Sequence, residues 1–289
     1  MAFLGIDAGA SATKWSVTDG DRTIAQGRTL PMDGHIYKDT SLSRIREVLT
    51  EIAEKTEGIK SVYAGITGLS LAEKDYAITK SLFAEYFPSA KFTGVSDMEL
   101  AYRAHLEPGE GILIYAGTGS IAVHITKSGE LKRMGGWGYL LGDEGAGYWI
   151  GREAIRSCLY ALEMGEPLSH FHETIFAELE AKDWVGIRNF VYSEHRSAIA
   201  SLSRFVSDEA NSGENAAKTI LDGSAHELNS LRNRMQHLLG SYSHTIVLAG
   251  GVLTDGSYAA NALMKLIGTQ AVIGNADIAA KAALLAAKL

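Results

Sequence analysis

The sequence predicts an α/β protein built from two related domains. Strand patterns alternate with helical ones over residues 1–106, which is typical of a sheet covered by helices. A unit of three short strands joined by two turns at residues 3–26 returns at residues 112–133. We therefore expect residues 1–106 and 107–289 to form the two domains, with the last helix able to pack back on the first.

The elements of the first domain follow from local patterns. Apolar residues at Leu42, Ile45, Leu49 and Ile52 share one helical face, and Ser96 or Asp97 is suited to begin a helix. The expected strands cover residues 3–7, 14–18, 22–30, 60–68 and 90–95, and the expected helices cover residues 40–56, 73–87 and 96–106.

The second domain begins with the repeated strand unit. Residues 146–240 are mostly helical, the strand pattern returns at 244–253, and "DIAAKAALLAAKL" at the C-terminal end is a strong helix former.

Composition excludes several classes of protein. The chain has 289 residues, 46% of them hydrophobic, and a net charge of −7, which disfavours a nucleic-acid binder. Its one cysteine, Cys158, allows no internal disulfide and no site of several thiolates. No signal peptide and no membrane-spanning run are indicated, so we expect a cytoplasmic protein that binds no membrane.

Two glycine-containing turns occupy equivalent places in the repeated units. "GIDAGASATK" at 5–14 and "YAGTGSIA" at 115–122 each leave a strand, turn through small residues and enter another strand. Such turns bring backbone N–H groups close to an anion, and Asp7 at a strand end could hold hydrated Mg²⁺. Either turn alone could be an ordinary hairpin, but their recurrence favours phosphate binding. Neither a Walker A loop nor a G-x-G-x-x-G helix start is present.

Two further positions carry weaker signals. Gly250–Gly251 follows an apolar strand and could let a base or ribose lie against the backbone, or could be a tight strand-to-helix turn. Asp97 stands at a predicted helix start, where the N-terminus stabilises a carboxylate. It would then be ionised at neutral pH and able to accept a hydroxyl proton, or it could be a plain helix cap.

The segment "GGWGYLLGDEGAGYWIG" at 135–151 combines glycines with aromatic and acidic residues. Trp137 offers a flat face of the kind found against sugar rings, and Asp143 can accept from two vicinal hydroxyls. Alternatively, Asp143 caps the helix expected near 145–162, and we expect Tyr148 and Trp149 to be structural. The scattered histidines predict no metal site, and Cys158 is expected to be buried and inert.

In this order, the motifs resemble those of the BadF/BadG/BcrA/BcrD-type ATPase family, within the actin-like ATPase and sugar kinase superfamily, and are most similar to its amino-sugar kinases. The resemblance is carried by "GIDAGASATK", "GITGLS", "SDMELAYRA", "LIYAGTGSIA", "GGWGYLLGDEG" and "VLAGGVL" and covers nearly the whole chain. It implies two ribonuclease H-like domains with an interdomain cleft for ATP, Mg²⁺ and a sugar.

The resemblance also assigns roles by motif. Asp97 matches the catalytic base, and Asp7 holds Mg²⁺ through water. By this resemblance, the residues that bind ATP and its phosphates are Asp7, Gly9, Ala10, Ser11, Lys14, Gly117, Thr118, Gly119, Gly250 and Gly251. The residues expected to bind the sugar are His35, Asp97, Ser120, Gly136, Trp137 and Asp143.

Some positions depart from the family pattern. Ala10–Ser11 replaces Gly-Thr in the first motif, Ile121 stands where amino-sugar kinases often carry Asn, and Lys281 replaces a glycine. Asp33 or His35 is the candidate to replace a sugar-binding Asn. The Ile121 departure puts N-acetylglucosamine itself in question.

These observations predict transfer of the γ-phosphoryl group of ATP to a hydroxyl, O6 by expectation, of N-acetylglucosamine or glucosamine, by a homodimer. A kinase for another hexose or N-acetylmuramic acid is the enzymatic alternative. A regulatory or activator ATPase, or a sugar sensor, is the alternative from another class.

Overall fold

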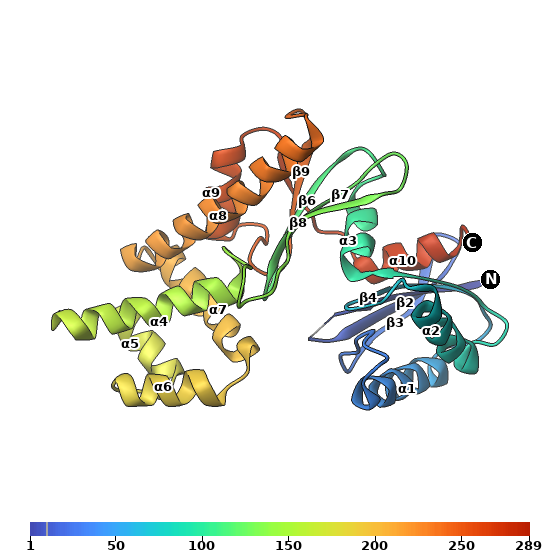
Figure 1. Cartoon of the computed structure of the whole chain (residues 1–289), viewed down its shortest axis with the longest axis horizontal. Coiled ribbons are helices and arrows are strands. Elements are labelled where there is room, and N and C mark those ends of the chain that lie inside the picture. Colours follow the sequence, from blue (N-terminus) through green and yellow to red (C-terminus); the bar gives the residue numbers. More distant parts are fainter. Residues whose placement is uncertain (10) are drawn as a thin grey trace. The chain divides into compact units, whose positions relative to one another are not determined.

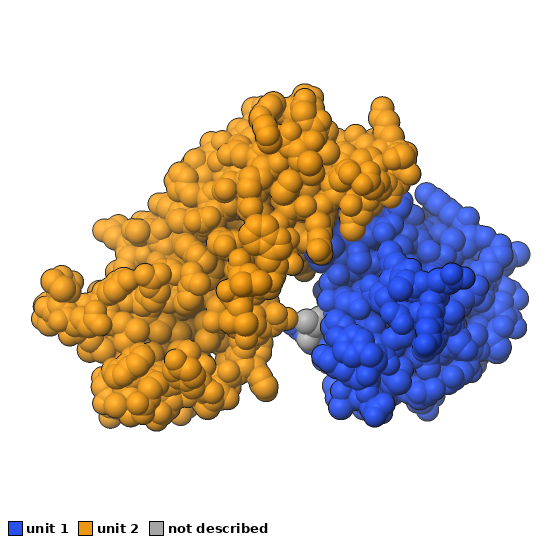
Figure 2. All heavy atoms as spheres, viewed as in Figure 1, with its two compact units in different colours: residues 1–106, 276–289 blue, residues 107–275 orange. Residues whose placement is uncertain are grey.

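Two compact units make up the chain in a computed structural model, which describes residues 1–9 and 11–289 (Figure 2). Unit 1 contains residues 1–106 and 276–289, and unit 2 contains residues 107–275. The C-terminal segment thus belongs to unit 1 together with residues 1–106.

Each unit contains one five-stranded sheet, and the two sheets have the same plan (Figure 1). The sheet of unit 1 has the order β3-β2-β1-β4-β5, and that of unit 2 has the order β8-β7-β6-β9-β10. In both, the first three strands in sequence are antiparallel and the remaining two extend the sheet in parallel with its first strand. The repeat predicted from the sequence is therefore a repeat of sheet topology.

Unit 1 comprises the strands β1 (Ala2–Ala8), β2 (Thr13–Asp19), β3 (Arg22–Thr29), β4 (Ile59–Ile66) and β5 (Lys91–Ser96) and the helices α1 (Asp39–Glu54), α2 (Glu73–Tyr86), α3 (Asp97–His105) and α10 (Ile278–Ala286). Helices α1 and α2 bury one face of the sheet against Leu4, Ile6 and Trp15. Helix α10 covers the other face, where Gly5 has no room for a side chain because the α10 backbone lies against it. This close approach is what places the alanine-rich C-terminal helix in unit 1.

Unit 2 comprises the strands β6 (Gly111–Ala116), β7 (Ser120–Ile125), β8 (Leu131–Gly135), β9 (Thr245–Ala249) and β10 (Ala271–Ile273) and the helices α4 (Gly147–Met164), α5 (His170–Glu178), α6 (Trp184–Ser193), α7 (Arg196–Ser212), α8 (Asn215–Leu239) and α9 (Tyr258–Ile267). Helices α8 and α9 pack on the sheet through Leu228, Leu231 and Leu263. Helices α4 to α7 form a second core around Phe171 and Val206, with Tyr148 and Trp149 packed against it as expected.

Candidate functional site

The first glycine turn joins β1 to β2 in unit 1. Asp7 and Lys14 are directly opposite each other in the antiparallel register, and the Gly9 N–H donates to the Ala12 carbonyl at 3.0 Å. Lys14 and Ser11 are exposed, while Asp7 is partly buried. Ala10 lies outside the described residues. The turn thus presents a lysine, a hydroxyl and a carboxylate at one end of the sheet.

Burial raises the pKa of Asp7 to about 6, against the attraction of Lys14 and with help from the carboxylates of Asp97 and Asp277. A negative region of this kind fits a divalent cation, which would relieve the repulsion. Over residues 1–9 and 11–289, however, no group of three or more His, Cys, Asp or Glu side chains is arranged to hold a metal ion. Mg²⁺ would accordingly take most of its ligands from water and phosphate, as it usually does in phosphoryl-transfer sites.

Asp97 is the first residue of α3. Ser96 is the N-cap, because its hydroxyl accepts from the Glu99 N–H at 3.1 Å. The Asp97 carboxylate accepts from the Met98 N–H at 2.9 Å. Burial nevertheless raises the pKa of Asp97. Its effect outweighs that of the N–H groups at the helix N-terminus, which were expected to stabilise the ionised form. A raised pKa suits a proton acceptor near neutral pH.

The loop that carries Asp33 and His35 lies on the segment after β4. The Gly34 N–H donates to the Thr67 carbonyl at 2.9 Å, and the His35 ring packs beside Gly68. The Asp33 carboxylate accepts from the His35 N–H at 2.9 Å, so it shapes its own loop. Thr67 follows the parallel strand β4 directly, in "GITGLS", so this loop is joined to the end of the strand.

The second glycine turn joins β6 to β7 in unit 2. The start of α4 fixes it, because the N–H groups of Gly147 and Tyr148 donate to the carbonyls of Gly117 and Thr118 at 2.8 and 3.1 Å. Across the turn, the Gly117 N–H donates to the Gly119 carbonyl at 2.9 Å. The Ser120 hydroxyl donates to the Glu144 carbonyl at 2.8 Å, which joins the turn to the 135–151 segment.

Four glycines of the 135–151 segment adopt the left-handed backbone conformation. Gly135, Gly136, Gly138 and Gly145 have φ values of 70°, 67°, 84° and 76°. Asp143 shares this conformation with φ 62°, which is costly for a residue with a side chain and is often found at functional sites. The segment is therefore a fixed, bent wall and not a linker.

Asp143 is only 7% exposed, and burial raises its pKa. Its carboxylate lies against Gly119, where the Cβ atom of any side chain would come within 2.5 Å of it. The helix-cap alternative is wrong, because the N-cap of α4 is Ala146 and no side chain caps it. Asp143 instead ties the bent wall to the second glycine turn.

The predicted sugar-facing residues Gly136 and Trp137 occupy the same wall. Trp137 is 57% exposed, and the Arg234 guanidinium lies 5.6 Å from its ring centroid. Gly136 faces Ile121, and a side chain there would come within 2.7 Å of the Ile121 methyl group. Ile121 thus packs against the backbone of the 135–151 segment, where an asparagine at the same position would have presented a polar amide.

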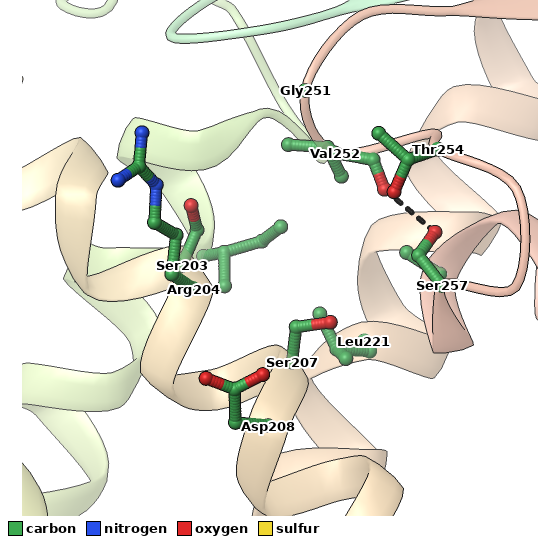
Figure 3. A pocket seen from close by; sticks show the side chains of 11 residues that line it. Ser203, Arg204, Ser207, Asp208, Leu221, Gly251, Val252, Thr254 and Ser257 are labelled. Atoms are coloured by element: carbon green, nitrogen blue, oxygen red, sulfur yellow. Dashed lines mark hydrogen bonds between the residues drawn. The ribbon is translucent and has the colours of Figure 1, made fainter.

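A pocket of about 280 Å³ lies in unit 2 between α7 and the turn after β9 (Figure 3). Gly251, Val252 and Thr254 line one side, and α7 residues that include Arg204 and Asp208 line another. Gly250 has φ 100° and sits too close to the Ala116 backbone for any side chain, so the turn is held against β6. Gly251 meets no atom that would obstruct a side chain, so its backbone is open to a ligand.

Two other expectations concern regions away from these turns. Cys158 is buried, and burial raises the pKa of its thiol to about 12, so it is unreactive as expected. Among the described helices, none is both long and apolar enough to cross a membrane.

Comparison with known proteins places this geometry in a family. The model of the BadF/BadG/BcrA/BcrD ATPase family matches residues 4–286. The chain belongs to this family. It is 29% identical over 265 residues to an N-acetylmuramic acid/N-acetylglucosamine kinase of Clostridium acetobutylicum, covering 88% of this chain and 86% of the relative. It is 25% identical over 256 residues to an N-acetyl-D-glucosamine kinase of Dictyostelium discoideum, covering 82% of this chain and 80% of the relative.

Solved structures share the fold. A Porphyromonas gingivalis protein, provisionally assigned as an N-acetylglucosamine kinase, superposes with a TM-score of 0.75 at 21% identity over 97% of both chains. A ROK family glucokinase of Streptomyces griseus, in complex with glucose and AMPPNP, superposes with a TM-score of 0.61 at 15% identity over 99% of this chain and 98% of the glucokinase. These likenesses and the paired sheets confirm the predicted fold of two ribonuclease H-like domains.

Proposed function

We propose that the protein is an ATP-dependent kinase of amino sugars, which transfers the γ-phosphoryl group to a hydroxyl, O6 in our proposal, of N-acetylglucosamine, glucosamine or N-acetylmuramic acid. The observation that carries the proposal is Asp97, held at the start of α3 by a hydrogen bond from the Met98 N–H, with a pKa raised by burial. The names of the two curated relatives support the substrate class.

In this proposal, the two glycine turns bind the phosphates of ATP and the Mg²⁺ ion. The turn of unit 1 offers Gly9, Ser11 and Lys14, and that of unit 2 offers Gly117, Thr118 and Gly119. Asp7 would hold Mg²⁺ through water, and the ion would neutralise charge that develops on the transferred group.

Adenosine would occupy the pocket beside Gly250 and Gly251. The absence of any obstruction at Gly251 supports this, as does the volume, which is close to the lower end of the range for small-molecule sites, about 300–1,000 Å³. The apolar residues Ile150 and Leu221 also line the pocket and would receive the flat base.

The sugar would contact Asp97 and His35 of unit 1 and Ser120, Gly136, Trp137 and Asp143 of unit 2. Since Asp143 is only 7% exposed, its carboxylate offers less open surface to sugar hydroxyls than an exposed one would. Trp137 is exposed and available to a sugar ring.

In the transfer step, the sugar hydroxyl attacks the γ-phosphorus, the bond to ADP breaks, and the Asp97 carboxylate takes the hydroxyl proton. The cytoplasmic location and the homodimer stay predictions.

A sugar panel with a coupled ADP assay tests the proposal. N-acetylglucosamine and N-acetylmuramic acid should stimulate ADP release above glucose and above a sugar-free control. The Asp97→Asn variant should lose this turnover while its sugar affinity stays within about tenfold, or about 1.4 kcal/mol. Asp21→Asn, on the exposed turn after β2, serves as the matched control. Turnover near the wild-type rate in Asp97→Asn would refute the role of Asp97.

A further inference from the structure

Two arginine side chains lie over aromatic rings of the 135–151 segment in unit 2. The guanidinium of Arg196, the first residue of α7, lies 5.7 Å from the Tyr139 ring centroid. The guanidinium of Arg234, on α8, lies 5.6 Å from the Trp137 ring centroid. Both arginines are exposed, and in the described part of the chain neither forms a salt bridge or a side-chain hydrogen bond. The rings therefore hold two positive charges in place without neutralising them.

The first turn of α7 packs on the start of α4, which in turn is bound to the second glycine turn. Gly151 of α4 has no room for a side chain, because a Cβ atom there would clash with the Ile199 carbonyl of α7. Gly147, one turn earlier on α4, donates its N–H to the Gly117 carbonyl at 2.8 Å. The helix that begins at Arg196 is therefore attached through α4 to the turn proposed to bind phosphate.

Asp143 and Tyr139 meet the same part of unit 2. The Asp143 carboxylate lies against Gly119 of the second glycine turn. The Tyr139 ring, over which Arg196 lies, packs edge-on against the Tyr148 ring at the start of α4, with 4.9 Å between the ring centroids. Burial raises the pKa of Asp143, and the positive charge of Arg196 acts in the opposite direction. The structure thus brings a guanidinium, an aromatic ring and a carboxylate together beside one turn.

The charge of Asp143 disfavours a negatively charged sugar unless a cation compensates it. N-acetylmuramic acid, one of the proposed substrates, differs from N-acetylglucosamine by a lactic acid ether whose carboxylate is ionised at neutral pH. Beside Asp143, this carboxylate would meet a like charge. A guanidinium stacked on a ring keeps the N–H groups in its own plane free, and these can bind a carboxylate through two parallel hydrogen bonds. Arg196 offers such a group.

We propose that Arg196 is a specificity-determining residue that binds the carboxylate of an anionic amino sugar, N-acetylmuramic acid, beside Asp143. This inference rests on the proposed kinase function and selects one of its substrates. The stacked geometry of Arg234 is similar, but Arg234 lies over Trp137, the ring proposed to receive the sugar itself. Arg196 therefore adds affinity for the acidic substituent and leaves the part of the sugar common to both substrates to other residues.

Selectivity between two sugars tests the assignment. The quantity measured is kcat/KM for N-acetylmuramic acid divided by kcat/KM for N-acetylglucosamine. Arg196→Gln should lower this ratio about 10- to 100-fold, because hydrogen bonds between charged groups are lost. In the same variant, kcat/KM for N-acetylglucosamine and KM for ATP should stay within about threefold of the wild type. Arg234→Gln removes the other stacked guanidinium and is the matched control, in which the ratio should stay within about threefold.

Three results would overturn the assignment. The first is an unchanged ratio in Arg196→Gln, which would leave Arg196 as a solvated surface residue. The second is an equal fall of the ratio in Arg234→Gln. The third is a KM for ATP that rises several-fold in Arg196→Gln with N-acetylglucosamine as the acceptor, since Arg196 would then bind a phosphate of the nucleotide and not the sugar.

A calorimetric titration needs no turnover. N-acetylmuramic acid and its uncharged methyl ester are titrated into the wild type and Arg196→Gln. The variant should bind the acid about 10- to 100-fold more weakly and the ester as tightly as the wild type does, which also shows that the variant is folded. Equal affinities of the two proteins for the acid overturn the inference even if the protein is a kinase. Binding of the acid through Arg196 in a protein that phosphorylates no sugar supports the inference and refutes the proposed function instead.

Discussion

Replacing Asp7 by asparagine separates what this carboxylate costs the fold from what it contributes to function. Its pKa of about 6 lies roughly 2 units above its ordinary value of 3.8, and the largest cause is burial. Each unit corresponds to about 1.36 kcal/mol, so the ionised carboxylate destabilises the folded protein by about 3 kcal/mol above pH 6. No hydrogen bond to the Asp7 side chain exists in the described part of the chain, so asparagine removes the charge without breaking one.

The sign of the pH dependence follows from linkage. A carboxyl group whose pKa is raised in the folded state favours folding while it is protonated, and that contribution disappears as the pH rises from 3.8 through about 6. Without nucleotide or metal, Asp7→Asn should therefore be about 2–3 kcal/mol more stable than the wild type at pH 8. The difference should largely vanish near pH 4.

Urea unfolding followed by circular dichroism at pH 8, 6 and 4 measures these differences. Asp21→Asn is the control, because replacing an exposed carboxylate should change stability by less than about 0.5 kcal/mol. Under the proposed function, the same Asp7→Asn protein should also lose ATP turnover, because the carboxylate proposed to hold Mg²⁺ through water is gone. An Asp7→Asn protein that is less stable than the wild type at pH 8, or equally shifted at pH 8 and pH 4, would refute the reasoning.

Three further predictions concern the base, the packing of α10 and the adenosine pocket. Because the pKa of Asp97 is raised above its ordinary value of 3.8, kcat/KM should rise with pH on the acidic side of the profile. Initial rates from pH 4.5 to 8 measure this dependence, and a flat profile would contradict the role of Asp97 as proton acceptor. Gly5→Ala places a methyl group against the backbone of Ala279 and Ala283, so unit 1 should lose about 3 kcal/mol or more in urea unfolding, and an unchanged midpoint would refute the packing. Gly251→Ala meets no atom, so the unfolding midpoint should stay the same while KM for ATP rises several-fold; an unchanged KM would place adenosine elsewhere.

Local sequence patterns predicted most of the fold. The strand–turn–strand units and the amphipathic helix at α1 depend on spacing within a dozen residues, and the same spacing revealed the repeat that became two sheets of one plan. Helix α9 and the short strand β10 were not predicted individually. A strand of three residues has too few positions to show an alternating pattern.

The candidate site was only partly readable from the sequence. The glycine turns, Asp7 and Asp97 could be predicted because each sits beside a recognisable strand or helix end. The left-handed backbone of Asp143 and the packing of its carboxylate against Gly119 had no local signal, since the two residues are far apart in the sequence.

The sequence by itself determined the α/β class, the two-domain repeat and the chemical types present at the turns, because these follow from local periodicity and residue chemistry. Only the tertiary structure decided which groups meet. Ala8 and Gly34 form backbone hydrogen bonds with Thr67 from separate segments, and burial, which no spacing encodes, raises the pKa of Asp97 against the helix N-terminus. Contacts between distant segments and the loss of solvent around a charge arise only when the chain packs.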